Sequence, residues 1–181
     1  MTIRIRRYRP GDRKAVLAAF RSNVPDHFPA SEEAWLRACL DAPDGPLFVV
    51  VRAGEVVGFG GYELSPFYDL GTLVFGLVRA DCHGTGIGRA LLTYRLLHMA
   101  RRKLRPRWVT VDTHPHTAGF FRRCGFEEIA RWPGGYRSGR DRVDLRFALS
   151  DAAVAALRAP GQALASAPSA RRSGAGRAPA S

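Results

Sequence analysis

The stretch that decides the fold reads Leu77-Val78-Arg79-Ala80-Asp81-Cys82-His83-Gly84-Thr85-Gly86-Ile87-Gly88-Arg89-Ala90-Leu91-Leu92. Three glycines at alternate positions stand between a strand-like run and a helix-like run. Because glycine has no Cβ, the backbone can turn sharply there and a ligand can approach it closely. The unpaired N–H groups of the first helical turn then converge on one point, at the positive end of the helix dipole. Such a turn is typical of a phosphate site.

Two common phosphate loops do not match this turn. A nucleoside triphosphatase loop continues with Lys and Ser or Thr after its last glycine, whereas Arg89 and Ala90 follow Gly88. The dinucleotide fingerprint needs a glycine at position 89, and it follows the first strand of its domain rather than a later one. A plain strand-to-helix connection without a ligand is the alternative that these residues leave open.

Apolar patterning on both sides of the turn predicts an α/β (α+β) domain with a mixed sheet. The expected strands are 3–8, 47–52, 55–62, 71–78, 108–113, 126–132 and 142–149. Helices are expected after Asp12, from Ser31, from the glycine turn to about residue 104, and over 117–124, with a short one over 151–158 left open. The second helix is expected to bury Trp35, Leu36, Cys39 and Leu40. The prediction is therefore a central mixed sheet of about six to seven strands with about four helices.

Length and composition favour one domain followed by a tail. The chain has 181 residues, of which 46% are hydrophobic and 24% are charged, in the range of globular proteins. We expect the domain to occupy residues 1–150. Residues 151–181 are dominated by Ala, Pro, Ser, Gly and Arg, and with so few bulky apolar side chains they are expected to form a disordered tail.

The net charge of +12 can indicate nucleic acid, an anionic membrane surface or an anionic ligand as a partner. Nearly all of the positive charge is Arg, with Lys only at Lys14 and Lys103, and it is scattered rather than gathered in one stripe. Nucleic acid is therefore the less favoured partner. No apolar run is long enough for a membrane helix. Three cysteines (Cys39, Cys82 and Cys124) at unrelated spacings indicate neither disulfides nor a metal site, so we expect a cytoplasmic protein without a metal.

Two segments narrow the interpretation of the glycine turn. The stretch from His83 to Leu92 resembles motif A of the GNAT family of N-acetyltransferases, usually Gln/Arg-x-x-Gly-x-Gly/Ala, with His83 where Gln or Arg is usual. Residues 116–126 (His-Thr-Ala-Gly-Phe-Phe-Arg-Arg-Cys-Gly-Phe) resemble motif B, which ends in an aromatic pair, a short spacer and Gly-Phe. The resemblance covers about residues 3–149. A narrower resemblance, to uncharacterised bacterial members, rests on Asn23-Val24-Pro25-Asp26-His27-Phe28, Gly60-Gly61-Tyr62 and residues 135–142.

The resemblance implies a GNAT-like fold and acetyl-CoA as the cofactor. The pyrophosphate would lie on the amides of the glycine turn, and the pantetheine arm would bond to the preceding strand as an added strand does. The strands 73–78 and 108–113 would splay apart to open a slot for the thioester. The implied cofactor contacts are Leu77, Val78, His83, Gly84, Thr85, Gly86, Ile87, Gly88, Arg89, Phe120 and Phe121.

The catalytic residues follow less directly from the resemblance. Many relatives have a Tyr in motif B to protonate or orient the leaving thiolate, but the matching residue here is Phe121. The alternatives are that Tyr136 or a His replaces it, or that water suffices. Many relatives use a Glu on a central strand as the base. Here the alternatives are Glu63, and Asp112 together with His114 at the end of the next parallel strand. Two candidate lids, residues 134–142 and the segment around His27, would set the amine specificity.

These observations predict an acetyl-CoA-dependent N-acetyltransferase acting on a primary amine of a small molecule or peptide. Direct transfer is favoured because no cysteine stands where a nucleophile is expected; Cys82 is the one candidate for a covalent relay. The alternative is a non-catalytic sensor or regulatory module that binds acyl-CoA, since Phe121 has no proton to give and strand 73–78 carries no acid. The acceptor is undetermined, and a homodimer is left open.

Overall fold

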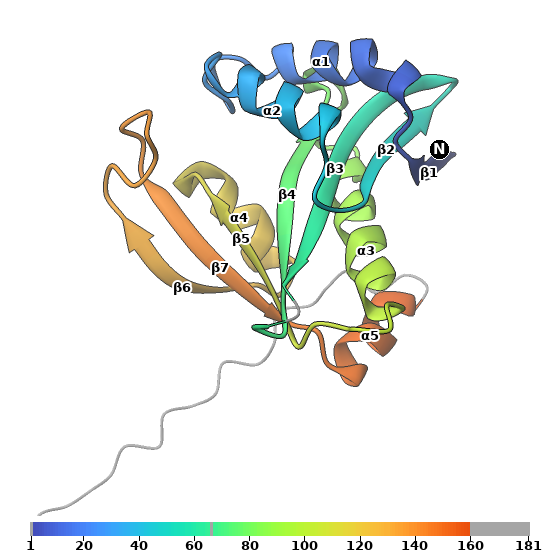
Figure 1. Ribbon diagram of the computed structural model, residues 1–181, viewed down its shortest axis with the longest axis vertical. Helices are drawn as coiled ribbons and strands as arrows, with labels where there is room; N and C mark the ends of the chain where they lie inside the picture. The colour runs from blue at the N-terminus through green and yellow to red at the C-terminus, as the bar shows by residue number, and fades with distance from the viewer. Residues whose placement is uncertain (1, 66, 160–181) are drawn as a thin grey trace, which may run out of the picture.

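Seven strands form one sheet in the order β1-β2-β3-β4-β5-β7-β6 (Figure 1) in the computed structural model, which describes residues 2–65 and 67–159. The strands are β1 (Ile3–Arg7), β2 (Leu47–Arg52), β3 (Glu55–Ser65), β4 (Leu70–Val78), β5 (Trp108–Thr113), β6 (Glu127–Trp132) and β7 (Arg142–Ala148). Neighbouring strands are antiparallel except β4 and β5, which are parallel. The expected mixed sheet is confirmed.

The helices are α1 (Arg13–Arg21), α2 (Glu32–Asp41), α3 (Ile87–Ala100), α4 (Pro115–Arg123) and α5 (Asp151–Arg158), with 3-10 turns at Pro10–Asp12 and Ala80–Cys82. The third helix ends at Ala100, before the expected residue 104. The short helix that the sequence left open is formed, because the Ser150 hydroxyl caps it by accepting a hydrogen bond from the Ala153 amide (3.1 Å). It brings the number of described α-helices to five rather than about four.

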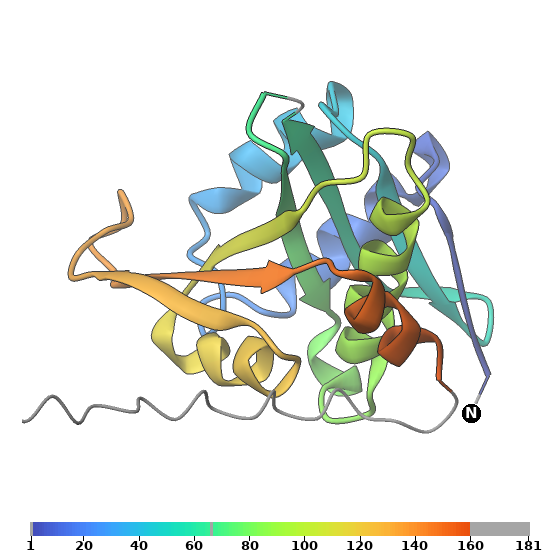
Figure 2. The same cartoon turned by 90° about the horizontal axis from the view of Figure 1, so that it is seen from below.

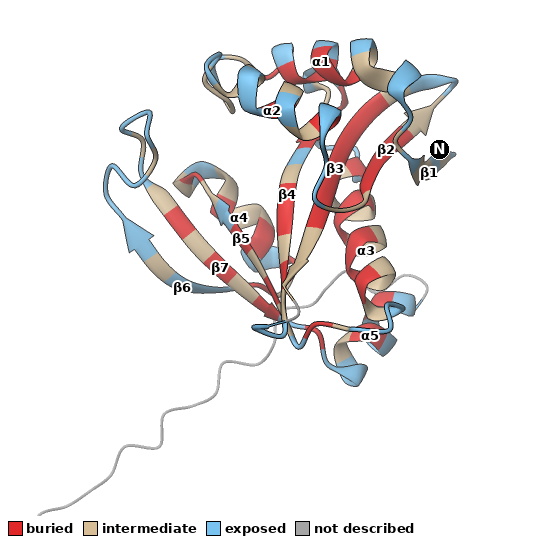
Figure 3. Cartoon of the chain, in the orientation of Figure 1, coloured by how far each residue is buried: buried red, intermediate tan, exposed pale blue. Residues whose placement is uncertain are grey.

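The helices pack on both faces of the sheet, and β2 shows why its sequence is a continuous apolar run. Phe48 and Val50 belong to the core cluster beneath α3, α4 and α5, whereas Leu47 and Val49 belong to the cluster beneath α1 and α2. Since successive side chains of a strand point to opposite faces, a strand covered on both sides needs apolar residues at every position. Figures 2 and 3 show the two helical layers and the buried central strands between them.

The helix α5 packs on the same core as α3. Its Val154 and Leu157 are 5% and 8% exposed, so the packed structure continues beyond residue 150. The remainder of the expected tail, residues 160–181, lies outside the described residues. Within residues 2–65 and 67–159, no helix combines the length and the apolar character needed to span a bilayer.

The expectation that Trp35 is a core residue of α2 is wrong, since its side chain is 58% exposed. The buried stripe of α2 is defined by Leu36 and Leu40, which are 0% and 6% exposed. A residue one position before the stripe points about 100° away from it, so Trp35 lies at the edge of the helix face that packs. Its ring rests on Phe75 of β4, with ring centroids 4.5 Å apart.

The sheet divides between β4 and β5 into two arms, one formed by β1 to β4 and the other by β5, β7 and β6. The two strands pair over three residues only, Leu70–Thr72 of β4 with residues 108–110 of β5. Beyond this closed end they diverge, as the splayed ribbons of Figure 1 show. The separation that the family resemblance implies is therefore present.

Candidate active site

The glycine turn joins β4 to α3 with its backbone in the left-handed region. Gly84 and Gly86 have φ values of +73° and +84°, which side chains with a Cβ rarely adopt. A Cβ at either position would meet nothing within 4 Å, so the space in front of the turn is open. The first helical bond runs from the Ala90 amide to the Gly86 carbonyl (3.0 Å). The amides of the first turn of α3 therefore lack helical acceptors and are available to an anion.

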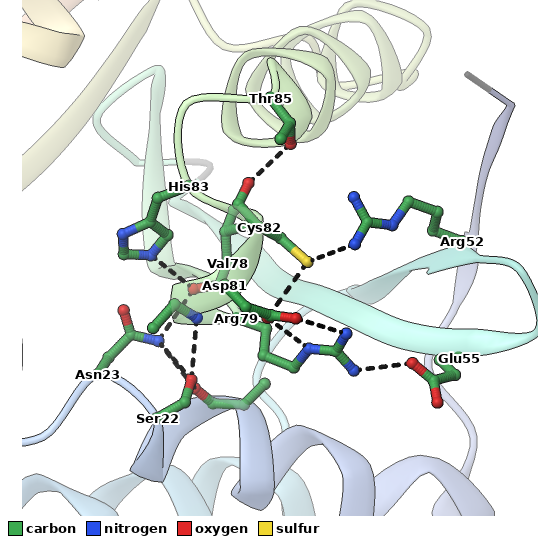
Figure 4. Close-up of polar contacts among 12 residues, drawn as sticks. Ser22, Asn23, Arg52, Glu55, Val78, Arg79, Asp81, Cys82, His83 and Thr85 are labelled. Carbon is green, nitrogen blue, oxygen red and sulfur yellow. Dashed lines mark hydrogen bonds and ion pairs between the residues drawn. The ribbon is translucent and has the colours of Figure 1, made fainter.

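The end of β4 and the turn are tied together by side chains (Figure 4). Nε2 of His83 and Nδ2 of Asn23 both donate to the Val78 carbonyl, each at 2.9 Å. The Thr85 hydroxyl donates to the Cys82 carbonyl at 2.7 Å. These bonds hold the turn in its shape before any ligand arrives, which lowers the ordering cost of binding.

The side chains implied as cofactor contacts fall into two groups. Phe120 lies beside the turn, because a Cβ on Gly88 would be 3.7 Å from its ring. Phe121 is instead a core residue, 7% exposed and packed against Phe126 at a centroid distance of 5.4 Å. Leu77 is also buried, at 1% exposure, so it can meet a ligand through its backbone only.

Four histidines from three segments gather at the open end of the splay. Nδ1 of His27, in the α1–α2 loop, lies 3.2 Å from Nε2 of His116 in the first turn of α4. The His27 ring is also 5.0 Å from that of His83 in the glycine turn. His116 stacks on His114 with centroids 5.7 Å apart. Sequence reasoning placed only His114 and His116 together, because His27 and His83 are distant from them along the chain.

Three of the four, His27, His114 and His116, favour the neutral form. Burial lowers the pKa of His27, and its neighbours His83 and His116 lower it further. Burial also lowers the pKa of His116 and of His114. Each of these three neutral rings carries one nitrogen able to accept a proton at neutral pH. In the part of the chain that the structure describes, no group of His, Cys, Asp or Glu side chains is arranged to hold a metal ion.

Asp112, His114 and Tyr136 meet at the carboxyl end of β5. The Tyr136 hydroxyl donates to Oδ2 of Asp112 at 2.9 Å, and its ring lies 4.6 Å from that of His114. Burial and the Asp112 carboxylate raise the pKa of Tyr136, so the phenol stays protonated. Burial also raises the pKa of Glu32 at the start of α2, and Asp112 adds to this effect while Arg140 opposes it.

Glu63, the other candidate base, lies elsewhere. It pairs in β3 with Thr72, which is the last residue of β4 in register with β5, so Glu63 stands at the closed end of the splay. Burial and the charge of Asp44 raise its pKa. The structure therefore brings three of the four candidate catalytic residues together and leaves Glu63 apart.

The two candidate lids touch each other. Nη2 of Arg140, in the loop between β6 and β7, donates to the Pro25 carbonyl in the α1–α2 loop at 3.0 Å. The His27–His116 contact lies between the same α1–α2 loop and α4. Both contacts span the two arms of the sheet at their open end.

Sequence reasoning missed Arg95 on α3. It is 2% exposed, and its Nη1 donates to the carbonyls of Phe75 (2.9 Å) and Gly61 (3.2 Å). Burial lowers the pKa of Arg95 to about 10, so the guanidinium remains charged at neutral pH. The signal was available: Arg95 stands four residues from both Leu91 and Met99, on the apolar face of a helix.

Comparison with known proteins agrees with this geometry. The profile of the acetyltransferase (GNAT) family matches residues 13–126. A curated relative, mycothiol acetyltransferase from Streptomyces bingchenggensis (strain BCW-1), is 30% identical over 132 residues, which is 68% of this chain. The match spans 42% of that protein, so the chain corresponds to less than half of its length.

Solved structures share the fold. A putative acetyltransferase of the GNAT family from Desulfovibrio desulfuricans has a TM-score of 0.71 at 23% identity, over 82% of this chain and 100% of that one. The ribosomal-protein-S18-alanine N-acetyltransferase from Escherichia coli has a TM-score of 0.65 at 20% identity, over 82% of this chain and 95% of that one. At these identities the likeness concerns the fold.

Proposed function

The chain belongs to the GNAT family of acetyltransferases, and we propose that it transfers the acetyl group of acetyl-CoA to an amine of a small molecule or peptide. The observation that carries this proposal is the open, left-handed turn at Gly84 and Gly86, which follows the part of β4 that no longer pairs with β5. A turn of this kind offers convergent amides to a diphosphate. The diverging strand offers unpaired backbone to an extended ligand arm.

The residues around the turn fit the coenzyme. The amides from Gly84 to Arg89 would hold the pyrophosphate, with the Phe120 ring beside them. The pantetheine arm would lie along β4 beyond Thr72, where β5 no longer pairs. Bound acetyl-CoA supplies a thioester whose C–S bond is exchanged for a C–N bond to the amine, which leaves the CoA thiol and the N-acetylated product.

We assign Asp112 and His114 as the groups that accept the proton lost by the amine. An alkylammonium with a pKa of ~10.4 must lose a proton before its nitrogen can attack. The Asp112 carboxylate is held by the Tyr136 hydroxyl, and neutral His114 adjoins the same phenol. Tyr136, whose pKa is raised, acts as a hydrogen-bond donor and positions Asp112. From this end of β5 the proton can pass to His116 and His27.

The burial of Cys82 and Cys124 supports direct transfer of the acetyl group, without a covalent intermediate on the protein. Cys82, the one candidate for a covalent relay, is 1% exposed and accepts a hydrogen bond from the Arg52 guanidinium (2.9 Å). Cys124 is fully buried in the core. Neither thiol has the exposure that a nucleophile needs to reach a thioester.

The acceptor would approach from the side of α2. Trp35 is exposed there over Phe75, and Glu32 lies one helical turn before it. Glu32 interacts electrostatically with Asp112 and Arg140 of the opposite arm. A carboxylate and an exposed indole on one helix suit an ammonium group.

The experiment has two steps. Calorimetric titration with acetyl-CoA and with CoA measures cofactor binding, and release of free thiol is then followed over a panel of polyamines, arylalkylamines and peptides with free α-amino groups. Binding with thiol release from at least one amine supports the proposal. Binding without release from any amine favours the sensor alternative, and the absence of heat with either coenzyme overturns both.

A further inference from the structure

Arg95 holds a positive charge inside the protein without an acidic partner. Its guanidinium makes no ion pair among residues 2–65 and 67–159, and its Nε has no hydrogen-bond partner. The groups it does reach are the carbonyls of Phe75 and Gly61, on neighbouring strands. A buried cation is costly unless the surrounding groups compensate it, so these carbonyl contacts are what retain it.

Glycines clear the space that the guanidinium occupies. A Cβ on Gly60 would lie 2.9 Å from Nη1 of Arg95, and a Cβ on Gly76 would lie 3.3 Å from Nη2. Any side chain at Gly60 would displace the guanidinium. The β3 and β4 glycines and Arg95 therefore form one structural unit.

This unit lies against a bulge in β4. The register between β3 and β4 passes from Phe59↔Leu77 to Gly61↔Val74, so Phe75 and Gly76 together face the single residue Gly60. Phe75 has φ +51°, which is strained for a residue with a Cβ. The bulge follows Thr72, so it lies in the part of β4 that no longer pairs with β5.

We propose that Arg95 is a positioning residue for acetyl transfer, which holds this bulge and makes the Gly76 amide a stronger donor to the acetyl carbonyl oxygen. The Phe75 carbonyl and the Gly76 N–H belong to one resonant peptide unit. A cation bonded to the carbonyl oxygen draws electron density through that unit and strengthens the N–H as a donor. Such a donor, fixed before the reaction, stabilises the negative charge that develops on the acetyl oxygen. This inference rests on the proposed function.

The test is the carbonyl stretch of acetyl-CoA labelled with 13C at the acetyl carbonyl, measured by infrared difference spectroscopy without an acceptor. The wild-type protein is compared with Arg95→Met, which removes the charge, and with Arg95→Lys, which keeps the charge on a single donor group. Arg146→Met is the matched control, because Arg146 also has an unpartnered Nε but lies over Trp108 on the other arm, 4.0 Å from its ring. Thermal melting shows that each variant is folded.

We expect the bound wild-type protein and the Arg146→Met control to lower the carbonyl frequency equally. Arg95→Met should lose at least half of that shift, while its dissociation constant for acetyl-CoA changes less than about threefold. The shift in Arg95→Lys should lie between those of the wild-type protein and Arg95→Met. With any amine that gives turnover, kcat should fall about tenfold in Arg95→Met with KM little changed. If Arg95→Met does not fold, Arg95→Lys decides the question by the same shift.

An undiminished shift in both Arg95 variants overturns the inference while leaving the proposed function in place. Wild-type protein that binds acetyl-CoA without any shift overturns it too. Failure of the wild-type protein to bind acetyl-CoA is a separate result, which removes the proposed function itself.

Discussion

Nδ1 of His27 lies 3.2 Å from Nε2 of His116, which joins two segments 89 residues apart in the sequence. The contact links the α1–α2 loop to the first turn of α4, at the open end of the splay between β4 and β5. Arg140 makes a second link from the other lid to the Pro25 carbonyl. The open end is thus bridged by side chains, and the bridge contains two histidines whose pKa values are lowered by burial.

The first prediction concerns this histidine contact and pH. Burial lowers the pKa values of His27 and His116 below 6.5, so between the folded and unfolded pKa values the unfolded chain binds more protons. The stability that neutral histidines contribute is therefore present above pH 6.5 and is lost as the pH falls through the folded pKa values. We expect the melting temperature to fall between about pH 7 and about pH 5, and to fall less in the double variant His27→Gln, His116→Gln. A thermal-shift series over this pH range measures both proteins. If the melting temperatures of the wild-type protein and of the double variant fell equally, the prediction would be wrong.

The second prediction concerns the glycine turn. Gly86→Ala forces a Cβ into the left-handed region and places a methyl group before the amides, so we expect a loss of about 1 kcal/mol in unfolding free energy and at least about tenfold weaker binding of acetyl-CoA. Gly54→Ala is the matched control: Gly54 has φ +85° in the β2–β3 hairpin, and its Cβ would also meet nothing within 4 Å. It should lose similar stability and keep its affinity. Calorimetry that shows equal affinities for the two variants would count against a phosphate site at the turn.

The third prediction separates the two candidate bases. Asp112→Asn should lower kcat/KM by about 100-fold, because the proton acceptor at the end of β5 is lost. Glu63→Gln should change it less than about threefold, since Glu63 lies at the closed end of the splay. Initial rates of thiol release measure both. A larger loss of kcat/KM in Glu63→Gln than in Asp112→Asn would indicate that Glu63 of β3 is the base.

The fourth prediction concerns α5. A chain that ends at Ser150 loses the buried side chains of Val154 and Leu157, so its unfolding free energy should fall by about 3 kcal/mol or more. A chain that ends at Ala159 keeps every described contact of α5 and should melt close to the full-length protein. Urea titration of the two truncations measures the difference. Equal stability of the two would show that α5 contributes little to the domain.

Some of the site followed from the sequence, and some did not. The glycine turn was predictable because Gly84 and Gly86 mark a backbone conformation that other residues resist. Arg95 was not recognised, although it interrupts an apolar helix face, because the sequence does not show that a bulge lies opposite it. Trp35 was misplaced, because periodicity locates a stripe to within about one residue and Trp35 lies at its edge.

The sequence by itself determined the order of strands and helices, the left-handed turn before α3 and the family resemblance, since all of these depend on local backbone sterics and on periodicity. Only the tertiary structure decided that Asp112 meets Tyr136 and that His27 meets His116. Those contacts depend on how far β5 diverges from β4 and where two loops cross, and both are set by packing between segments that no local pattern connects.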